Sequence, residues 1–186
     1  TVIGFPHGSH ETVIKVAEAE LALAEGCTEL DMVINIGKMI AGDTVYVKNE
    51  IKLLADAAHA KGAILKVILE TCYLTDEQKK IACRLSEEAG ADFVKTSTGK
   101  ITEGATPEAA VVMCLAIAEY HRKTGRRIGF KAAGGVRTAA DAALYYTIVK
   151  EQLSEEWLTP ELFRIGASSL ANELLSAIEG KEIKYF

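Results

Sequence analysis

Residues 91–100 read ADFVKTSTGK, in which an apolar run ends at Lys95 and a cluster of Thr, Ser and Gly follows. The run is typical of the end of a buried strand. The same pattern recurs in AILKVILE, which contains Lys66, and in IGFKAAG, which contains Lys131. Because an unpaired ammonium group is costly to bury, three lysines at matching places in predicted strands need a common explanation.

Six short apolar runs are predicted to be strands: TVIGF, ELDMVINI, AILKVILE, DFVKTS, IGFKAAG and LFRIGAS. Residues near their centres are separated by 27 positions (Gly4 to Asp31) at the shortest and by 36 (Lys95 to Lys131) at the longest. This is the length of one strand and one crossover helix, so the spacing predicts a repeated strand–helix unit and a parallel sheet.

The segments between these runs carry helix signals. Thr75 with Gln78 predicts a capping box, and Thr106 before Pro107 predicts an N-cap with proline at the first helical position. Apolar residues recur at helical spacing in two further segments, at Val47, Ile51, Leu54 and Ala58 and at Leu170, Leu174 and Ile178.

Two architectures fit this alternation, a doubly wound open sheet and a (β/α)8 TIM barrel. No GxGxxG motif follows the first run and no GxxxxGK[ST] motif occurs, which disfavours the nucleotide-binding open sheet. The barrel accounts better for the lysines, because barrel strands point alternate side chains inward and carry functional groups at their carboxyl ends. We therefore expect residues 1–186 to be a single barrel domain covering about strands 3 to 8.

Composition narrows the classes of partner. The net charge of −5 argues against a nucleic-acid or anionic-membrane partner, and no apolar stretch approaches the roughly 20 residues that a membrane helix needs. The four cysteines have no CxxC spacing, which suits free thiols in a reducing cytoplasm. His7 and His10 have no partner at metal-ligand spacing, so we expect no metal.

Asp31, Lys66, Lys95 and Lys131 occupy matching positions in four consecutive predicted strands and are expected to point at a common centre. One interpretation is a structural salt-bridge network. The other is amine chemistry, in which a lysine with a lowered pKa attacks a carbonyl and forms an iminium that accepts electrons from a breaking C–C bond. Two lysines and an aspartate that moves protons are the minimum for a class I aldolase site.

The loops after the last three runs are rich in small and hydroxyl residues just before a predicted helix. Barrels commonly bind phosphate in their last loops, against a helix N-terminus, although the same residues are also common in turns. The candidate phosphate-binding residues are Thr98, Gly99, Lys100, Gly134, Gly135, Gly166, Ser168 and Ser169.

Taken together, ELDMVIN, LKVILETCYLTDEQ, ADFVKTSTGK, GFKAAGGVRTAADA and FRIGASSL resemble the 2-deoxy-D-ribose-5-phosphate aldolase family. The resemblance implies a (β/α)8 barrel that reversibly cleaves deoxyribose 5-phosphate to acetaldehyde and glyceraldehyde 3-phosphate, without metal or organic cofactor. It also implies that Lys95 forms the Schiff base, that Lys131 lowers its pKa, that Asp31 relays protons, that Lys66 pairs with Asp31, and that the loop residues named above hold the phosphate.

Two departures from the family pattern stand out. Ala132 occupies a position that is often proline, and the family's first two strands have no counterpart here, so we expect an N-terminally incomplete barrel.

Two other functions stay open: a different Schiff-base phosphosugar aldolase or transaldolase-like barrel, and an inactive phosphosugar-binding fragment. The expected partner is a small phosphosugar, and the expected assembly is a homo-oligomer, either a dimer or a tetramer. Tyr185 is assigned no role.

Overall fold

Six parallel strands form one sheet in the order in which they occur along the chain. The computed structural model describes residues 1–185. The strands are β1 (Val2–Ile3), β2 (Glu29–Val33), β3 (Ile64–Ile68), β4 (Phe93–Lys95), β5 (Gly129–Ala133) and β6 (Phe163–Gly166). Each predicted apolar run contains one of these strands, so the six strand predictions are confirmed, although the strands are shorter than the runs.

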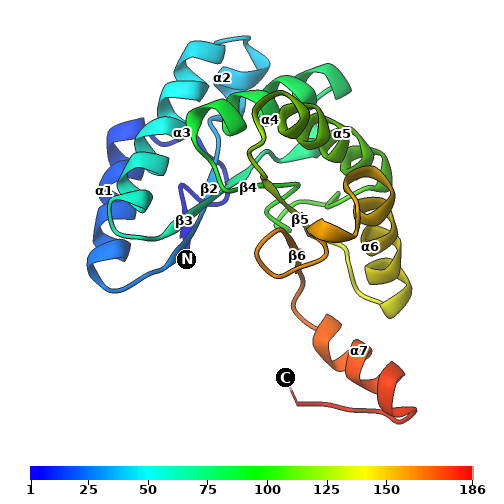
Figure 1. The fold of residues 1–186 in the computed structure, drawn as a ribbon. Helices are drawn as coiled ribbons and strands as arrows, with labels where there is room; N and C mark the ends of the chain where they lie inside the picture. Colours follow the sequence, from blue (N-terminus) through cyan, green and yellow to red (C-terminus); the bar gives the residue numbers. More distant parts are fainter. Residues whose placement is uncertain (186) are drawn as a thin grey trace.

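Helices follow the strands and lie outside the sheet (Figure 1). They are α1 (Thr12–Ala24), α2 (Ile36–Ile40), α3 (Thr44–His59), α4 (Asp76–Ala89), α5 (Pro107–Thr124), α6 (Ala139–Leu153) and α7 (Leu170–Glu179), with short 3-10 helices η1 (Thr71–Tyr73) and η2 (Glu155–Trp157). The predicted capping box at Thr75 and N-cap at Thr106 are both present.

The strand order and the curvature of the sheet identify the architecture. A doubly wound sheet reverses its strand order at a switch point, whereas this sheet runs from β1 to β6 in sequence. The sheet also curls, because Arg164 on β6 contacts Glu29 on β2 at 3.1 Å, and four strand spacings of about 4.8 Å in a flat sheet would hold them apart. The chain therefore has six consecutive units of a (β/α)8 barrel, in which β1 and β6 are the outer strands of residues 1–185.

The two faces of the sheet differ in chemistry. Side chains that point outward are apolar and pack against the helices: Leu30, Met32, Leu65, Val67, Val94, Phe130 and Ala132 belong to one core cluster with Val47, Ile51, Leu54 and Ala58 of α3. Side chains that point inward include the charged residues of β2 to β6. The hydrophobic effect thus stabilises the sheet–helix layer, and the inner face is left for polar chemistry.

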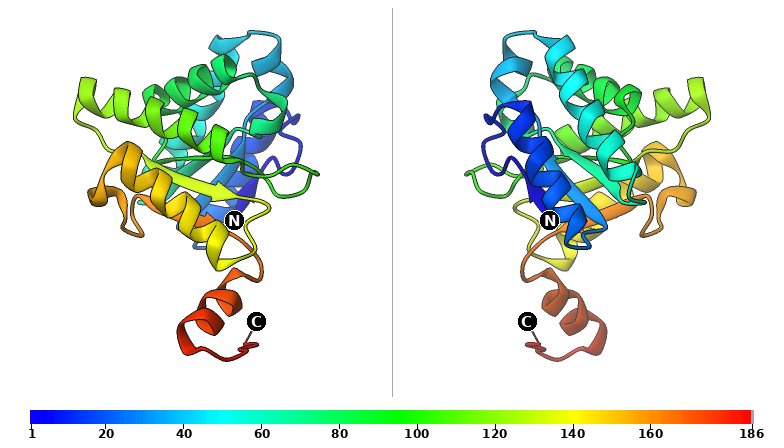
Figure 2. Two further views of the ribbon diagram at one scale, coloured as in Figure 1. Left: turned by 90° about the vertical axis from the view of Figure 1, so that its right-hand side faces the viewer. Right: turned by 90° about the vertical axis from the view of Figure 1, so that its left-hand side faces the viewer.

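Helix α7 departs from the predicted packing. Leu170 is buried and Leu174 is half-buried, but Ile178 is 77% exposed. Both side views show α7 lying apart from the arc of the other helices (Figure 2). The predicted apolar stripe is therefore covered only at its first turn, because the far end of the helix extends beyond β6 and α6.

An ion pair outside the barrel interior links α1 to α3. The Nζ atom of Lys15 donates to Glu50 Oε1 at 2.7 Å and to the carbonyl of Val33 at 2.8 Å, and both charged side chains are fully buried. Glu50 also accepts from the backbone N–H of Asn35 at 2.9 Å. These contacts satisfy the buried charges, so the pair ties two helices to the carboxyl end of β2.

Glu87 is the basis of a stability prediction. It is buried between α4 and α5, and its Oε1 atom has no hydrogen-bond partner within residues 1–185. Burial raises the pKa of Glu87 from 4.5 to about 7, with the charges of Glu119 and Glu88 adding to the effect and Arg126 opposing it. The folded chain therefore binds more protons than the unfolded chain between these two pH values, and the free energy of unfolding should fall as the pH rises through this window.

We expect Glu87→Gln to remove the loss of stability that accompanies ionisation of Glu87. The substitution should raise the free energy of unfolding by about 3 kcal/mol at pH 8, with little change at pH 4. Urea unfolding at the two pH values measures the difference. Glu20→Gln, on the exposed surface of α1, is the control and should change neither value. An equal gain at both pH values would contradict the assignment of the effect to ionisation.

Three negative findings apply to residues 1–185. No helix there has the length and apolar character needed to span a membrane. No cluster of three or more His, Cys, Asp or Glu side chains in that range is arranged to hold a metal ion. The four cysteines, Cys27, Cys72, Cys83 and Cys114, are all free thiols.

Candidate active site

The register of the sheet places the predicted charged residues in two neighbouring pairs on the inner face, two residues apart along the strands. Asp31 on β2 lies beside Lys66 on β3, and Lys95 on β4 lies beside Lys131 on β5. Side chains alternate between the two faces of a strand, so each of these four residues points inward. The curvature of the sheet then brings β2 and β5 close enough for their side chains to meet.

Asp31 is the centre of this cluster. Its Oδ2 atom accepts hydrogen bonds from Lys95 Nζ at 2.8 Å and from Lys131 Nζ at 2.7 Å, and its Oδ1 atom accepts from Lys66 Nζ at 3.1 Å. Asp31, Lys66 and Lys95 are each less than 10% exposed, whereas 18% of the Lys131 side chain is exposed. One carboxylate thus holds three ammonium groups, two of them on the same oxygen.

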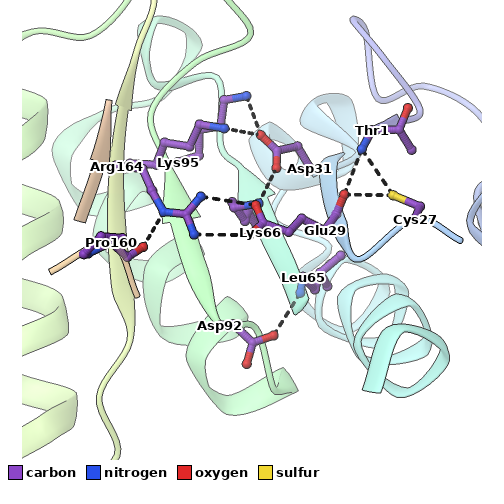
Figure 3. A network of polar contacts seen from close by, with 11 residues as sticks. Thr1, Cys27, Glu29, Asp31, Leu65, Lys66, Asp92, Lys95, Pro160 and Arg164 are labelled. Carbon is purple, nitrogen blue, oxygen red and sulfur yellow. Dashed lines mark hydrogen bonds and ion pairs between the residues drawn. The ribbon is translucent and has the colours of Figure 1, made fainter. Parts of the chain in front are cut away.

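A second layer of charges, which includes Glu29 at the start of β2, lies beside this cluster (Figure 3). Glu29 Oε2 accepts from Lys66 Nζ at 2.6 Å, and Glu29 Oε1 lies 3.1 Å from Arg164. The centre of the Phe93 ring lies near both cations, 6.0 Å from the ammonium of Lys66 and 5.8 Å from the guanidinium of Arg164. Gly129 faces the ring, and a Cβ atom there would lie 2.3 Å from it. Because Lys66 Nζ contacts both Glu29 and Asp31, it connects this second layer of charges to Asp31.

Burial and neighbouring charges shift the pKa values of the two central residues in the direction of imine chemistry. Burial lowers the pKa of the Lys95 ammonium group; Asp31 opposes this change, and the charges of Lys131 and Lys66 add to it. Burial opposes ionisation of Asp31, but the charges and hydrogen bonds of Lys95 and Lys131 outweigh it and hold the pKa of Asp31 below its usual range. The second lysine thus assists in lowering the pKa of Lys95, but burial is the larger cause.

The charge balance of the cluster has two chemical consequences. Four basic groups, Lys66, Lys95, Lys131 and Arg164, face two carboxylates, Asp31 and Glu29. This excess of positive charge favours the neutral amine of one lysine, which is the form that attacks carbonyl carbon. It also attracts an anionic ligand to the open end of the barrel.

The loops after β4, β5 and β6 meet above this cluster. The N–H of Ala105 donates to the carbonyls of Ala133 and Gly134 at 3.0 and 2.9 Å, and the N–H of Gly134 donates to the carbonyl of Gly166 at 3.4 Å. Gly134 has φ +82°, and a Cβ atom there would lie 3.1 Å from the Cα atom of Gly99. Only glycines permit the two loops to approach so closely.

The candidate phosphate-binding residues fall into two groups in the structure. Gly99, Lys100, Gly135, Ser168 and Ser169 are exposed on the loops at the carboxyl ends of the strands, while Thr98, Gly134 and Gly166 are partly buried. Ser169 directly precedes α7 and makes no side-chain cap bond. The structure brings Gly99, Gly134 and Gly166 together through backbone contacts.

Three residues that the sequence patterns did not single out contribute to the site. Glu29 and Arg164 form the ion pair of the second layer, and Glu70 accepts hydrogen bonds from Thr98. The alternation of strand residues offered a signal for Glu29, because it lies two positions before Asp31 and therefore faces the same side. Nothing in the sequence pairs Glu29 with Arg164, which is 135 residues away.

The sequence model of the DeoC/LacD family of aldolases matches residues 1–175. A deoxyribose-phosphate aldolase of Thermococcus gammatolerans is 54% identical over 142 residues, which are 76% of this chain and 60% of the relative. The deoxyribose-phosphate aldolase of Bacillus cytotoxicus is 45% identical over 186 residues, the whole of this chain and 74% of the relative.

A solved structure agrees with these matches. The tetrameric deoxyribose phosphate aldolase of Aeropyrum pernix is 32% identical, with a TM-score of 0.75, over 96% of this chain and 67% of that one. The chain spans 60% of the length of its Thermococcus relative. The matched sequence, the curled parallel sheet and the lysine cluster at the carboxyl ends of its strands lead to one assignment: the chain belongs to the DeoC/LacD family of aldolases.

Proposed function

We propose that the protein is a class I aldolase that reversibly cleaves 2-deoxy-D-ribose 5-phosphate to glyceraldehyde 3-phosphate and acetaldehyde. The observation that carries the proposal is the buried ammonium of Lys95, which shares Oδ2 of Asp31 with Lys131 at 2.8 and 2.7 Å. The substrate rests on the names of the three relatives described above, all of which are called deoxyribose-phosphate aldolase. Cleavage of deoxyribose 5-phosphate but not of fructose phosphates would distinguish this function from that of another phosphosugar aldolase.

The cluster supplies each step of the reaction. The neutral amine of Lys95 attacks the aldehyde carbon of the open-chain substrate, and the resulting carbinolamine loses water to give an iminium. A base removes the proton of the C3 hydroxyl, the C2–C3 bond breaks, and its electron pair moves into the iminium to give an enamine and glyceraldehyde 3-phosphate. Protonation of the enamine carbon and addition of water then release acetaldehyde. Asp31 is hydrogen-bonded to the Lys95 nitrogen, and Lys131 donates to the same Asp31 oxygen, so these two residues move the protons.

The substrate phosphate is assigned to the loops above the cluster. Gly99, Gly135, Gly166, Ser168 and Ser169 offer backbone N–H and hydroxyl groups, and Ser168 and Ser169 do so at the N-terminus of α7. The N–H of Gly134 is bonded to the carbonyl of Gly166, so Gly134 contributes by letting the loops approach closely. Lys100 is exposed on the same loops and adds a cation.

Trapping of the imine tests the reaction class. The protein is incubated with acetaldehyde or deoxyribose 5-phosphate, reduced with borohydride, and the modified peptide is mapped by mass spectrometry. A reduced adduct on Lys95 supports the proposal. A folded sample that forms no adduct on Lys95 with either compound would refute it, and an adduct on Lys131 instead would reassign the nucleophile.

Lys131→Leu is expected to lower kcat/KM by about 10²- to 10⁴-fold, because a proton-transfer group is lost. The pKa of Lys95 should rise, because one positive neighbour is removed. Asp31 also loses the hydrogen bond from Lys131, so its Oδ2 atom is left to the ammonium of Lys95. The rate of imine trapping as a function of pH measures this change, and its midpoint should move to higher pH. An unchanged midpoint would exclude the electrostatic role of Lys131.

Lys100→Ala is expected to raise KM for deoxyribose 5-phosphate by about tenfold with little change in kcat, because a phosphate contact is made equally in the ground state and the transition state. Lys61→Ala is the matched control, since Lys61 is exposed and precedes β3 at the opposite end of the strands. A large loss of kcat at unchanged KM would contradict the assignment of Lys100 to the phosphate.

The assembly is proposed as a homo-oligomer in the cytoplasm. The solved relative from Aeropyrum pernix is tetrameric, and the four cysteines are free thiols, as is usual in a reducing compartment. Analytical ultracentrifugation gives the number of subunits, and a monomer at micromolar concentration would refute the oligomer.

A further inference from the structure

Glu70 adopts a backbone conformation that needs a compensating interaction. It follows β3 directly with φ 53° and ψ 64°, in the left-handed region. Within residues 1–185 only Glu70 and Ser154 have positive φ without being glycine. Left-handed backbone is disfavoured for a residue with a Cβ atom, and Glu70 is also 1% exposed. A buried carboxylate in such a conformation must be held by strong local contacts.

Those contacts all lead to one residue of the loop after Lys95. Glu70 Oε1 accepts from the backbone N–H of Thr98 at 3.1 Å, and Glu70 Oε2 accepts from the Thr98 hydroxyl at 2.5 Å. Hydrogen bonds to an ionised acceptor are stronger than those between neutral groups. The neighbouring backbone adds two bonds, from Leu69 N–H to the carbonyl of Lys95 and from Thr71 N–H to the carbonyl of Thr96, both at 3.0 Å. The end of β3 therefore holds the whole segment from Lys95 to Thr98.

These bonds change the role expected for Thr98. Both of its donors are bonded to Glu70, and its hydroxyl oxygen also accepts from the N–H of Lys100 at 3.1 Å. Thr98 in this structure therefore has no donor left for a phosphate. The N–H of Gly99, in contrast, makes no hydrogen bond within residues 1–185, and Gly99 and the Lys100 side chain are exposed on the loop.

We propose that Glu70 is a positioning residue for the phosphate of the substrate. Its carboxylate fixes Thr98, and Thr98 fixes the turn that presents the Gly99 N–H and the Lys100 ammonium group to the phosphate. Glu70 itself is buried and does not touch the substrate. This inference rests on the proposed function, because it deepens the account of how the site takes a phosphorylated sugar.

The substitution Glu70→Gln tests the proposal. A neutral amide cannot accept both Thr98 hydrogen bonds, since its NH₂ group is a donor. The ratio of kcat/KM for deoxyribose 5-phosphate to kcat/KM for unphosphorylated deoxyribose should fall about tenfold or more, because charge-assisted bonds that hold the phosphate loop are lost. Thr98→Val should lower the same ratio, and the two losses should not add in the double variant, because both remove one interaction. Glu77→Gln, on the exposed surface of α4, is the matched control and should leave the ratio unchanged.

Two further measurements keep the test independent of folding and of catalysis. Glu70→Gly removes the carboxylate, and glycine adopts the left-handed backbone conformation without strain. The variant should therefore stay folded by circular dichroism and show the same fall in the kcat/KM ratio as Glu70→Gln. Calorimetric titration with inorganic phosphate reads binding without turnover, and phosphate affinity should fall about tenfold in Glu70→Gln. A protein that forms no imine yet shows this fall would refute the proposed reaction and keep the inference. Equal losses on both sugars, or unchanged phosphate affinity in folded variants, would overturn the role of Glu70.

Discussion

Lys95→Arg is expected to abolish aldol cleavage, with kcat lowered on the order of 10⁴-fold or more, and to abolish the borohydride-trapped adduct. Arginine keeps a positive charge beside Asp31, but its guanidinium does not lose a proton at accessible pH and therefore cannot attack a carbonyl. Because Lys95 is 7% exposed and bonded to Asp31 at 2.8 Å, the substitution removes the nucleophile while the cluster keeps its charge.

Steady-state cleavage of deoxyribose 5-phosphate and mapping of the reduced adduct are the two measurements. Lys123→Arg, on the exposed end of α5, is the matched control and should retain full activity. Retained activity in Lys95→Arg, or an adduct on another lysine of that variant, would remove Lys95 from the centre of the mechanism.

Asp31→Asn is expected to lower both turnover and stability, and it separates two steps of the reaction. The amide has the shape of the carboxylate but no charge, so the lysines lose the acceptor that two of them share. The pKa of Lys95 should fall further, because the charge and hydrogen bond of Asp31 are the influences that raise it. We therefore expect the imine to form at lower pH than in the wild type, while kcat falls by about 10²- to 10⁴-fold because proton transfer is lost.

The same substitution should lower the free energy of unfolding by about 3 kcal/mol, because it leaves buried ammonium groups without their counter-charge. Asp56→Asn is the control for stability, since Asp56 forms an exposed ion pair with Lys52 and such pairs contribute about 1 kcal/mol or less. Simultaneous loss of imine trapping and of turnover in a folded Asp31→Asn protein would contradict the separation of the two steps.

Local sequence patterns predicted a large part of the fold and of the site. The spacing of apolar runs predicted six parallel strands with crossover helices, and the structure confirms them. The caps at Thr75 and Thr106 were also predicted, because capping depends on residues within one turn of each other. Asp31, Lys66, Lys95 and Lys131 could be selected because a charge inside an apolar strand is visible in the sequence itself.

The tertiary structure decided which charges meet. Glu29 and Arg164 are separated by 135 residues and Glu70 and Thr98 by 28, and neither pair has a local signal. Lys15 and Glu50 resemble ordinary helix-surface residues in sequence, yet they form a fully buried ion pair. The apolar stripe of α7 was predicted from its spacing, but Ile178 is exposed because the helix extends beyond its neighbours.

The sequence by itself thus determined the repeating strand–helix unit and the set of charged strand residues, since both depend on periodicities of two and 3.6 residues along the chain. Only the tertiary structure decided the order of the two charge layers, the contact between β2 and β6, and the loop conformation that Glu70 holds. These depend on the curvature and register of the sheet, which bring together residues that no local pattern connects.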